Sequence, residues 1–217
     1  MAVTIQVFSD YVCPFCRLGE VAAKQAAAQT GAQLVWRAYQ LRKSGPPRLE
    51  PQGEVMTKGW RATIYPMADR LGLALRQPTR LPLTRSAHEA AAWARAQSRF
   101  TAFHEALFHA YFNEDADIGE PAVLLALARQ LNLDADDLNE ALVTQRHADD
   151  VNEDLLIGET YGVTGVPTFV IGGTLLYGVQ DLATLTRAVE AVRAGQPVAQ
   201  TTQQPRLPIG IRGLQRQ

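Results

Sequence analysis

Ser9-Asp10-Tyr11-Val12-Cys13-Pro14-Phe15-Cys16 decides the fold of this 217-residue chain and holds both of its cysteines. The run before it, Val3-Thr4-Ile5-Gln6-Val7-Phe8, alternates in a way that is typical of a strand. Proline suits the first position of a helix, because its missing N–H would have no partner there. We therefore expect a strand, a tight connection, and a helix that runs from Cys13 to about Gln29, with Gly31 as its C-terminal stop.

The spacing of the two cysteines points to redox chemistry. A disulfide between them would close a small ring and stabilise the fold little, because the entropy that such a link removes from the unfolded chain grows with loop size. A thiol attacks only as the thiolate, and a free cysteine, with a pKa of about 8.5, is mostly protonated at neutral pH. The unpaired N–H groups and the dipole of a helix N-terminus favour the anion. We expect Cys13 to attack, and Cys16, one turn later and more enclosed, to resolve the mixed disulfide.

The dipeptide between the cysteines sets the expected redox poise. Phe15 adds an apolar surface beside the sulfur, but neither it nor Pro14 carries a charge. A histidine there would help to hold the thiolate. We therefore expect Cys13 to be less acidic than in the strongest periplasmic oxidants, and the couple to be less oxidising.

The alternatives for the cysteine pair are half of a zinc site and two inert buried thiols. Structural zinc usually takes four ligands, and the chain has no second cysteine pair. Histidines would have to complete the shell, and His104 and His109 are five residues apart, which places them poorly on one helix face. Redox use is favoured, and no metal is expected. The four histidines are His88, His104, His109 and His147.

Several other polar and aromatic residues are assigned structural roles. Asp10 is assigned to the end of the strand and the start of the helical turn, with a proton relay as the alternative. Glu20 is placed on a solvated helix face. Aromatic residues at helical or strand spacing are assigned to the core. Tyr11, two residues before Cys13, is the exception and is a candidate substrate contact. The aromatic residues assigned to the core are Trp36, Trp60, Tyr65, Trp93, Phe108 and Phe112.

Beyond the first helix the chain changes its periodicity twice. Residues 34–39 are a second extended candidate, and a strand, helix, strand order implies parallel pairing through a right-handed crossover. The proline-containing run 44–51 marks a boundary, and helical spacing prevails over 52–161. Two β-rich runs then flank Gly172-Gly173, which predicts a hairpin, and an amphipathic helix follows from about Leu182, with Gly195 beyond its end.

The predicted organisation follows from these segments. Residues 1–45 and 162–195 form one α/β domain, and residues 46–161 form an inserted all-helical domain. Residues 196–217 contain three prolines, six glutamines and three arginines but no acidic residue, which is typical of a mobile or surface-wrapping tail.

Composition excludes several classes of partner. Apolar residues make up 47% of the chain and charged residues 20%, as in ordinary globular proteins. The formal net charge is −1, so no global field favours nucleic acid or an anionic membrane. No apolar run is long enough for a spanning helix, and the N-terminus lacks the pattern of a secretory signal. We expect a cytoplasmic location, where a disulfide is more often catalytic than structural.

The order of elements resembles the DsbA-like group of the thioredoxin superfamily over roughly residues 1–195. The motifs that carry the resemblance are residues 9–16 and Tyr161-Gly162-Val163-Thr164-Gly165-Val166-Pro167-Thr168-Phe169. Leu107-Phe108-His109-Ala110-Tyr111-Phe112 and Asp117-Ile118-Gly119 further resemble the insertion of its FrnE-type branch. The resemblance implies a thioredoxin-like fold, in which helices flank a central sheet, with a large inserted all-helical domain.

The resemblance also implies the residues of the site. A cis peptide bond is expected before Pro167, facing the active-site disulfide, and the backbone of Val166 would pair with an extended substrate segment. Cys13 and Cys16 are the expected catalytic residues. Tyr11, Pro14, Phe15, Val166 and Pro167 are the expected substrate contacts. Some FrnE-type proteins have further cysteines, whereas this chain has none beyond its pair, so electrons must pass through external partners.

Three functions fit this sequence. The first is a thiol-disulfide oxidoreductase whose substrates are protein disulfides or small thiols such as glutathione, with the dithiol as its own redox group and no other cofactor. The second is a glutathione-dependent enzyme of the related branch of kappa-class transferases and 2-hydroxychromene-2-carboxylate isomerases, although that branch presents a serine where both cysteines stand here. The third is a peptide-binding, chaperone-like module without turnover. The sequence leaves open the direction of electron flow, the reductant and the oligomeric state.

Overall fold

The computed structural model describes residues 2–199 of the chain. Their contacts divide them into two compact units, one formed by residues 2–41 and 156–199 and the other by residues 42–155. The sequence placed the corresponding boundaries after residues 45 and 161, a few positions further along. The second boundary falls inside a continuous helix, Ala148–Tyr161, where no break in periodicity marks it.

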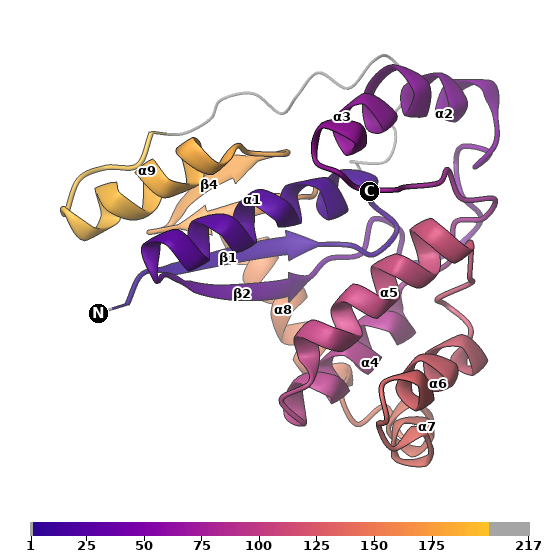
Figure 1. Cartoon of the computed structure of the whole chain (residues 1–217). Helices are drawn as coiled ribbons and strands as arrows, with labels where there is room; N and C mark the ends of the chain where they lie inside the picture. The colour runs from indigo at the N-terminus through magenta and orange to yellow at the C-terminus, as the bar shows by residue number, and fades with distance from the viewer. Residues whose placement is uncertain (1, 200–217) are drawn as a thin grey trace. The chain divides into compact units, whose positions relative to one another are not determined.

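The elements of the first unit are strands and helices (Figure 1). In chain order they are β1 (Thr4–Ser9), α1 (Pro14–Thr30), β2 (Gln33–Ala38), the last turns of α8 (Ala148–Tyr161), β3 (Thr168–Ile171), β4 (Thr174–Tyr177) and α9 (Leu182–Arg193).

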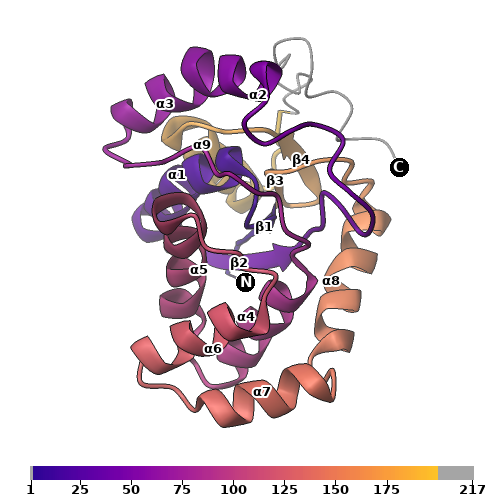
Figure 2. The same cartoon turned by 90° about the vertical axis from the view of Figure 1, so that its right-hand side faces the viewer.

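The regular elements of the second unit that the structure describes are all helices (Figure 2). Its elements are α2 (Glu54–Gly59), the π-helical turn η1 (Trp60–Ile64), α3 (Tyr65–Arg70), α4 (Arg85–Ala96), α5 (Phe100–Glu114), α6 (Pro121–Gln130), α7 (Ala135–Val143) and the first turns of α8.

The four strands form one mixed sheet in the order β2-β1-β3-β4. β1 and β2 are parallel, so that Val7 lies opposite Trp36, and β1 pairs antiparallel with β3, so that Val7 also lies opposite Phe169. β3 and β4 form the antiparallel hairpin predicted from Gly172-Gly173. A sheet flanked by helices with an inserted helical unit is the fold class that the sequence predicted.

Helix α1 begins and ends where the sequence indicated. Cys13 is its N-cap residue, Pro14 occupies its first turn, and Gly31 closes it in the left-handed conformation with φ of 66°. The Gly31 N–H donates to Ala27 O, which satisfies one carbonyl of the last turn.

The two faces of the sheet pack against different helices of the first unit (Figure 1). On one face Phe169 contacts α1, where a Cβ added to Gly19 would lie 3.3 Å from the Phe169 ring. On the other face Phe8 contacts α8, where a Cβ added to Gly158 would lie 3.1 Å from the Phe8 ring. Both glycines therefore permit the close approach of a helix to an aromatic ring of the sheet.

Aromatic rings pack against one another in the core of the helical unit. Trp60 of η1 packs against Phe112 of α5 with ring centroids 6.0 Å apart, and Phe112 stacks on Phe108 at 6.2 Å. Trp93 of α4 contacts Phe103 and donates its Nε1–H to Asp137 Oδ2 over 2.6 Å. The core assignment made from the sequence is confirmed for Trp36, Trp60, Trp93, Phe108 and Phe112, which are all buried.

Two further observations concern membrane crossing and the C-terminal end of the described residues. Across the described residues, no helix combines the length and the apolar character that a membrane crossing needs. Of the predicted tail, residues 196–199 have no regular structure, and residues 200–217 lie outside the described part of the chain.

Candidate active site

Cys13 lies in the short connection between β1 and α1, directly before the first residue of the helix. Its N–H donates to Asp10 O over 3.0 Å, and its own carbonyl accepts the Cys16 N–H over 3.1 Å, which starts the helix. The helix cap involves no bond to the Cys13 side chain. The thiol instead donates to Val166 O over 3.6 Å. Cys13 Sγ therefore faces a backbone carbonyl and accepts no N–H at the start of the helix.

Val166 belongs to the loop between α8 and β3. The Val166–Pro167 peptide bond is cis, as the resemblance implies. The loop is held from both sides, because Thr168 Oγ1 donates to Gly165 O over 2.6 Å and the Gly178 N–H donates to Pro167 O over 2.8 Å. These bonds fix the Val166 carbonyl opposite the Cys13 sulfur, although 153 positions separate the two residues in the sequence.

Cys16 is the more deeply buried of the two free thiols, with 1% of its surface exposed against 4% for Cys13. Burial raises the pKa of the Cys16 thiol well above its ordinary value, and the hydrogen bond and charge of Cys13 add to this effect. The Asp10 N–H, which donates to Cys16 Sγ over 3.5 Å, and the Ser9 hydroxyl act in the opposite direction on the same pKa. Cys16 is thus a protonated thiol at neutral pH.

Asp10 lies between the end of β1 and the start of α1, as expected, but its side chain does not cap the helix. Its carboxylate Oδ2 accepts the Leu41 N–H over 2.7 Å and does not cap α1, whose N-cap makes no side-chain hydrogen bond. The reason is position, because Asp10 stands three residues before the N-cap Cys13, and only its backbone carbonyl reaches the helix start. The side chain ties β1 to the segment that follows β2.

Tyr39, beside this carboxylate, provides a pH-dependent test of the arrangement. Burial raises the pKa of the Tyr39 phenol, and the negative charge of Asp10 adds to the shift. Because the folded-state pKa exceeds the unfolded value of about 10, the contribution to stability is fully present below that pH and is lost as the pH rises through the folded pKa. We expect Tyr39→Phe to remove this alkaline decline in the free energy of unfolding, measured by urea titration at several pH values. An equal decline in both proteins would contradict the assignment.

Glu20 is not on a solvated helix face, as the sequence suggested, but is 1% exposed. Its carboxylate lies 2.5 Å from Arg17 Nη1 and 2.5 Å from Lys24 Nζ. The two cations stand three residues before and four residues after it on α1, so both reach the same face of the helix. This double pairing compensates for the cost of burying the charge.

The predicted site residues differ in their position and in how deeply they are buried. The structure brings Cys13, Cys16 and Val166 together, and Pro167, the residue after Val166, is buried. Pro14 and Phe15 are half-buried in the first turn of α1. Tyr11 exposes only 3% of its surface and so presents almost none to a substrate in this state.

Ser9 is not among the site residues predicted from the sequence, although its hydroxyl acts on the Cys16 thiol. Its strand alternation with Val7 is the signal that would have placed it on the side of the sheet that faces α1.

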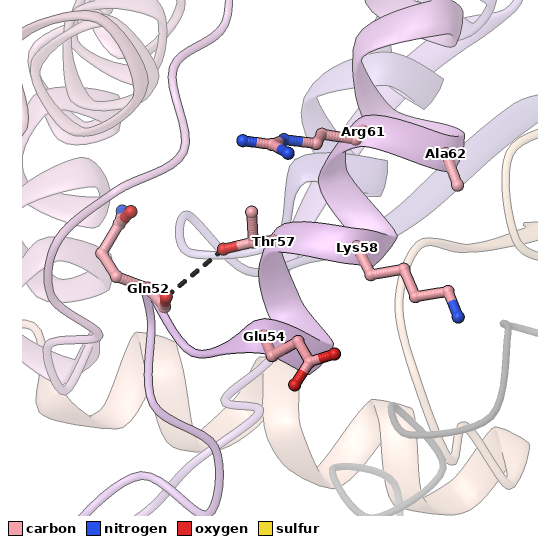
Figure 3. A pocket seen from close by; sticks show the side chains of 6 residues that line it. All are labelled: Gln52, Glu54, Thr57, Lys58, Arg61 and Ala62. Atoms are coloured by element: carbon pink, nitrogen blue, oxygen red, sulfur yellow. Dashed lines mark hydrogen bonds between the residues drawn. The ribbon is translucent and has the colours of Figure 1, made fainter.

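A separate pocket of about 590 Å³ lies within the helical unit (Figure 3). Its long charged side chains, those of Lys58 and Arg61, extend in different directions, and the Thr57 hydroxyl donates to Gln52 O over 3.3 Å. The pocket has no cysteine, and among the described residues no group of three or more metal-ligating side chains is placed to hold an ion. Its lining residues are Gln52, Glu54, Thr57, Lys58, Arg61 and Ala62.

The comparison with models of protein families identifies the family to which the chain belongs. Residues 4–190 match the model of the DSBA-like thioredoxin domain. The chain therefore belongs to the DSBA-like thioredoxin domain family.

Individual proteins are similar to the chain over most of its length. The chain is 33% identical over 193 residues to the uncharacterized protein YwbO of Bacillus subtilis, covering 87% of this chain and 96% of the relative. Among solved structures, a probable DsbA oxidoreductase from Streptomyces coelicolor is 22% identical with a TM-score of 0.77, covering 96% of this chain and 97% of that one. A 2-hydroxychromene-2-carboxylate isomerase is 18% identical with a TM-score of 0.73, covering 88% of this chain and 97% of the other. At these identities the solved structures establish the shared fold.

Proposed function

We propose that this protein is a thiol-disulfide oxidoreductase that works through Cys13 and Cys16. The observation that carries the proposal is the pairing of two free thiols, one at the N-cap of α1 and one a turn later, with a fixed backbone carbonyl opposite the first. The shared fold does not choose between oxidoreductase and isomerase, since both occur among the similar solved structures. The presence of both sulfurs favours dithiol chemistry.

The reaction needs no other redox group. In the oxidising direction for the protein, the Cys13 thiolate attacks a substrate disulfide R–S–S–R′, forms Cys13–S–S–R, and releases R′–S⁻, which takes up a proton. Cys16 then attacks Cys13 Sγ, closes the Cys13–Cys16 disulfide, and releases R–SH, which carries the proton that Cys16 gave up. The substrate disulfide is reduced by two electrons and the protein dithiol is oxidised by two. An external thiol, such as glutathione, would restore the dithiol by the reverse sequence.

The Val166 backbone gives the site a place for an extended substrate. Its carbonyl faces Cys13 Sγ, and within the described residues its N–H takes part in none of the backbone hydrogen bonds of the loop. A substrate segment that lies along Val166 could pair with these groups as an added strand pairs with a sheet edge. Pairing of this kind recognises backbone, so we propose protein or peptide disulfides as substrates alongside small thiols.

The test is reduction of a protein disulfide by glutathione or dithiothreitol with the protein in catalytic amounts. We expect turnover by the wild type and none above background by the Cys13→Ala, Cys16→Ala double variant, because both sulfurs are required. Suppression of aggregation that is unchanged in the double variant, without wild-type turnover, would favour the chaperone-like alternative. Glutathione-dependent isomerisation that survives Cys16→Ala would favour the isomerase alternative. The FrnE-type branch and the cytoplasmic location stay predictions from the sequence.

A further inference from the structure

The end of β1 presents two polar groups to the sulfur of Cys16. The Asp10 N–H donates to Cys16 Sγ over 3.5 Å. Ser9, the residue before it, is 5% exposed, and its hydroxyl has no hydrogen-bond partner of ordinary geometry among the described residues. A buried hydroxyl without such a partner is costly, so its position calls for an explanation.

The pleat of the strand explains where the Ser9 hydroxyl lies. Val7 and Ser9 share one face of β1, because alternate residues of a strand point the same way. Val7 lies opposite Phe169, whose ring contacts Gly19 of α1. Ser9 therefore faces α1, the helix that carries Cys16. In agreement, the Ser9 hydroxyl lowers the pKa of the Cys16 thiol, against the larger opposing effect of burial.

Asp10 keeps these donors in place. Its carboxylate accepts the Leu41 N–H over 2.7 Å, and its carbonyl accepts the Cys13 N–H over 3.0 Å. The Ser9 carbonyl in turn accepts the Tyr39 N–H over 3.0 Å. The two residues are thus held both to the segment after β2 and to the start of α1.

We propose that the Ser9 hydroxyl and the Asp10 N–H form a two-donor site for the Cys16 thiolate. This inference rests on the proposed oxidoreductase function and adds a residue to it. Cys16 is anionic only while it attacks Cys13 Sγ or leaves it, and a buried sulfur at that moment has no water to stabilise its charge. Donors already in position stabilise the charge without reorganisation. In closure the Cys16 proton goes to the released substrate thiol, and in reduction of the ring Cys16 leaves as thiolate and takes a proton back.

The experiment follows the reaction of the reduced full-length protein with excess 5,5′-dithiobis(2-nitrobenzoate). Attack by Cys13 releases a first thionitrobenzoate and forms a mixed disulfide, and ring closure by Cys16 releases a second. We expect Ser9→Ala to slow the second release about tenfold, the effect of losing one hydrogen bond to a charged group, and to leave the first release unchanged. Ser9→Thr, which keeps a hydroxyl, should be faster than Ser9→Ala.

The controls distinguish a failure of the Ser9 proposal from a failure of the proposed oxidoreductase function. Thr30→Ala removes a hydroxyl from the far end of α1, where it donates to Ala26 O, and should change neither release. An unchanged second release in Ser9→Ala, an equal slowing of both releases, or a Ser9→Thr variant that has the wild-type unfolding midpoint yet is as slow as Ser9→Ala would overturn the proposal. If the wild type itself gave no second release, the proposed oxidoreductase function would fail instead.

Discussion

A Cys16→Ser variant should accumulate disulfide-linked complexes with its substrates, and a Cys13→Ser variant should accumulate none. Without the resolving sulfur, the adduct on Cys13 can be released only by an external thiol. In the wild type Cys16 stands in the adjoining helical turn, and well-oriented intramolecular reactions reach effective concentrations on the order of 10⁵ M or more. The difference in adduct lifetime between the variant and the wild type should therefore span several orders of magnitude.

The measurement is non-reducing electrophoresis with mass spectrometry of the adducts, after incubation with glutathione disulfide and with a protein disulfide. The Cys13→Ser variant is the matched control, because it keeps a thiol in the same site. Cys16 exposes 1% of its surface, and burial raises the pKa of its thiol, so it should not replace Cys13 as the attacking group. Equal trapping by the two variants would contradict the assigned roles.

A Phe169→Ala variant should lose about 3–5 kcal/mol of unfolding free energy, the usual cost of truncating a buried phenylalanine. The ring is completely buried and lies between β3 and Gly19 of α1, so its removal leaves a cavity directly beneath the helix that carries the dithiol. A loss of that size is a large part of the roughly 5–15 kcal/mol that typically stabilises a folded protein.

Urea titration checks this prediction through a lower midpoint with an unchanged slope. Leu156→Ala is the matched control, since it truncates an apolar side chain of the same unit that is 62% exposed, and it should change stability by no more than about 0.5 kcal/mol. Similar shifts in the two variants would show that Phe169 does not anchor α1 to the sheet.

Local signals explain which parts of the molecule the sequence could predict. The run before Cys13, the proline after it and Gly31 define β1 and α1, because alternation, N1 proline and a left-handed C-cap depend on a few neighbouring residues. The hairpin follows in the same way from Gly172-Gly173 between two β-rich runs. The cysteine pair could be found because its chemistry depends on a spacing of three along one helix.

The errors concern residues whose environment is set by distant segments. Glu20 has a polar side chain on a helix, which locally indicates a solvated face. Its ion pairs with Arg17 and Lys24 lie within α1, but its burial to 1% exposure is set by tertiary packing. Aspartate is a residue type that often caps helices, but the Asp10 carboxylate accepts the Leu41 N–H, 31 positions away. Ser9 is an ordinary strand end until α1 is placed over it. These contacts depend on how elements pack, which periodicity does not report.

The discontinuity of the first unit has a consequence for biosynthesis. The thiol of Cys13 and the carbonyl opposite it are 153 residues apart in the chain, and at about 5–20 residues per second a ribosome needs roughly 8–30 s to make that interval. During this time the nascent dithiol has left or is leaving the exit tunnel without β3, the cis-proline loop or α9. Cys13 and Cys16 are therefore synthesised well before the residues that enclose them in the folded protein. A disulfide formed in that interval would form in a different chemical environment from that of the folded protein.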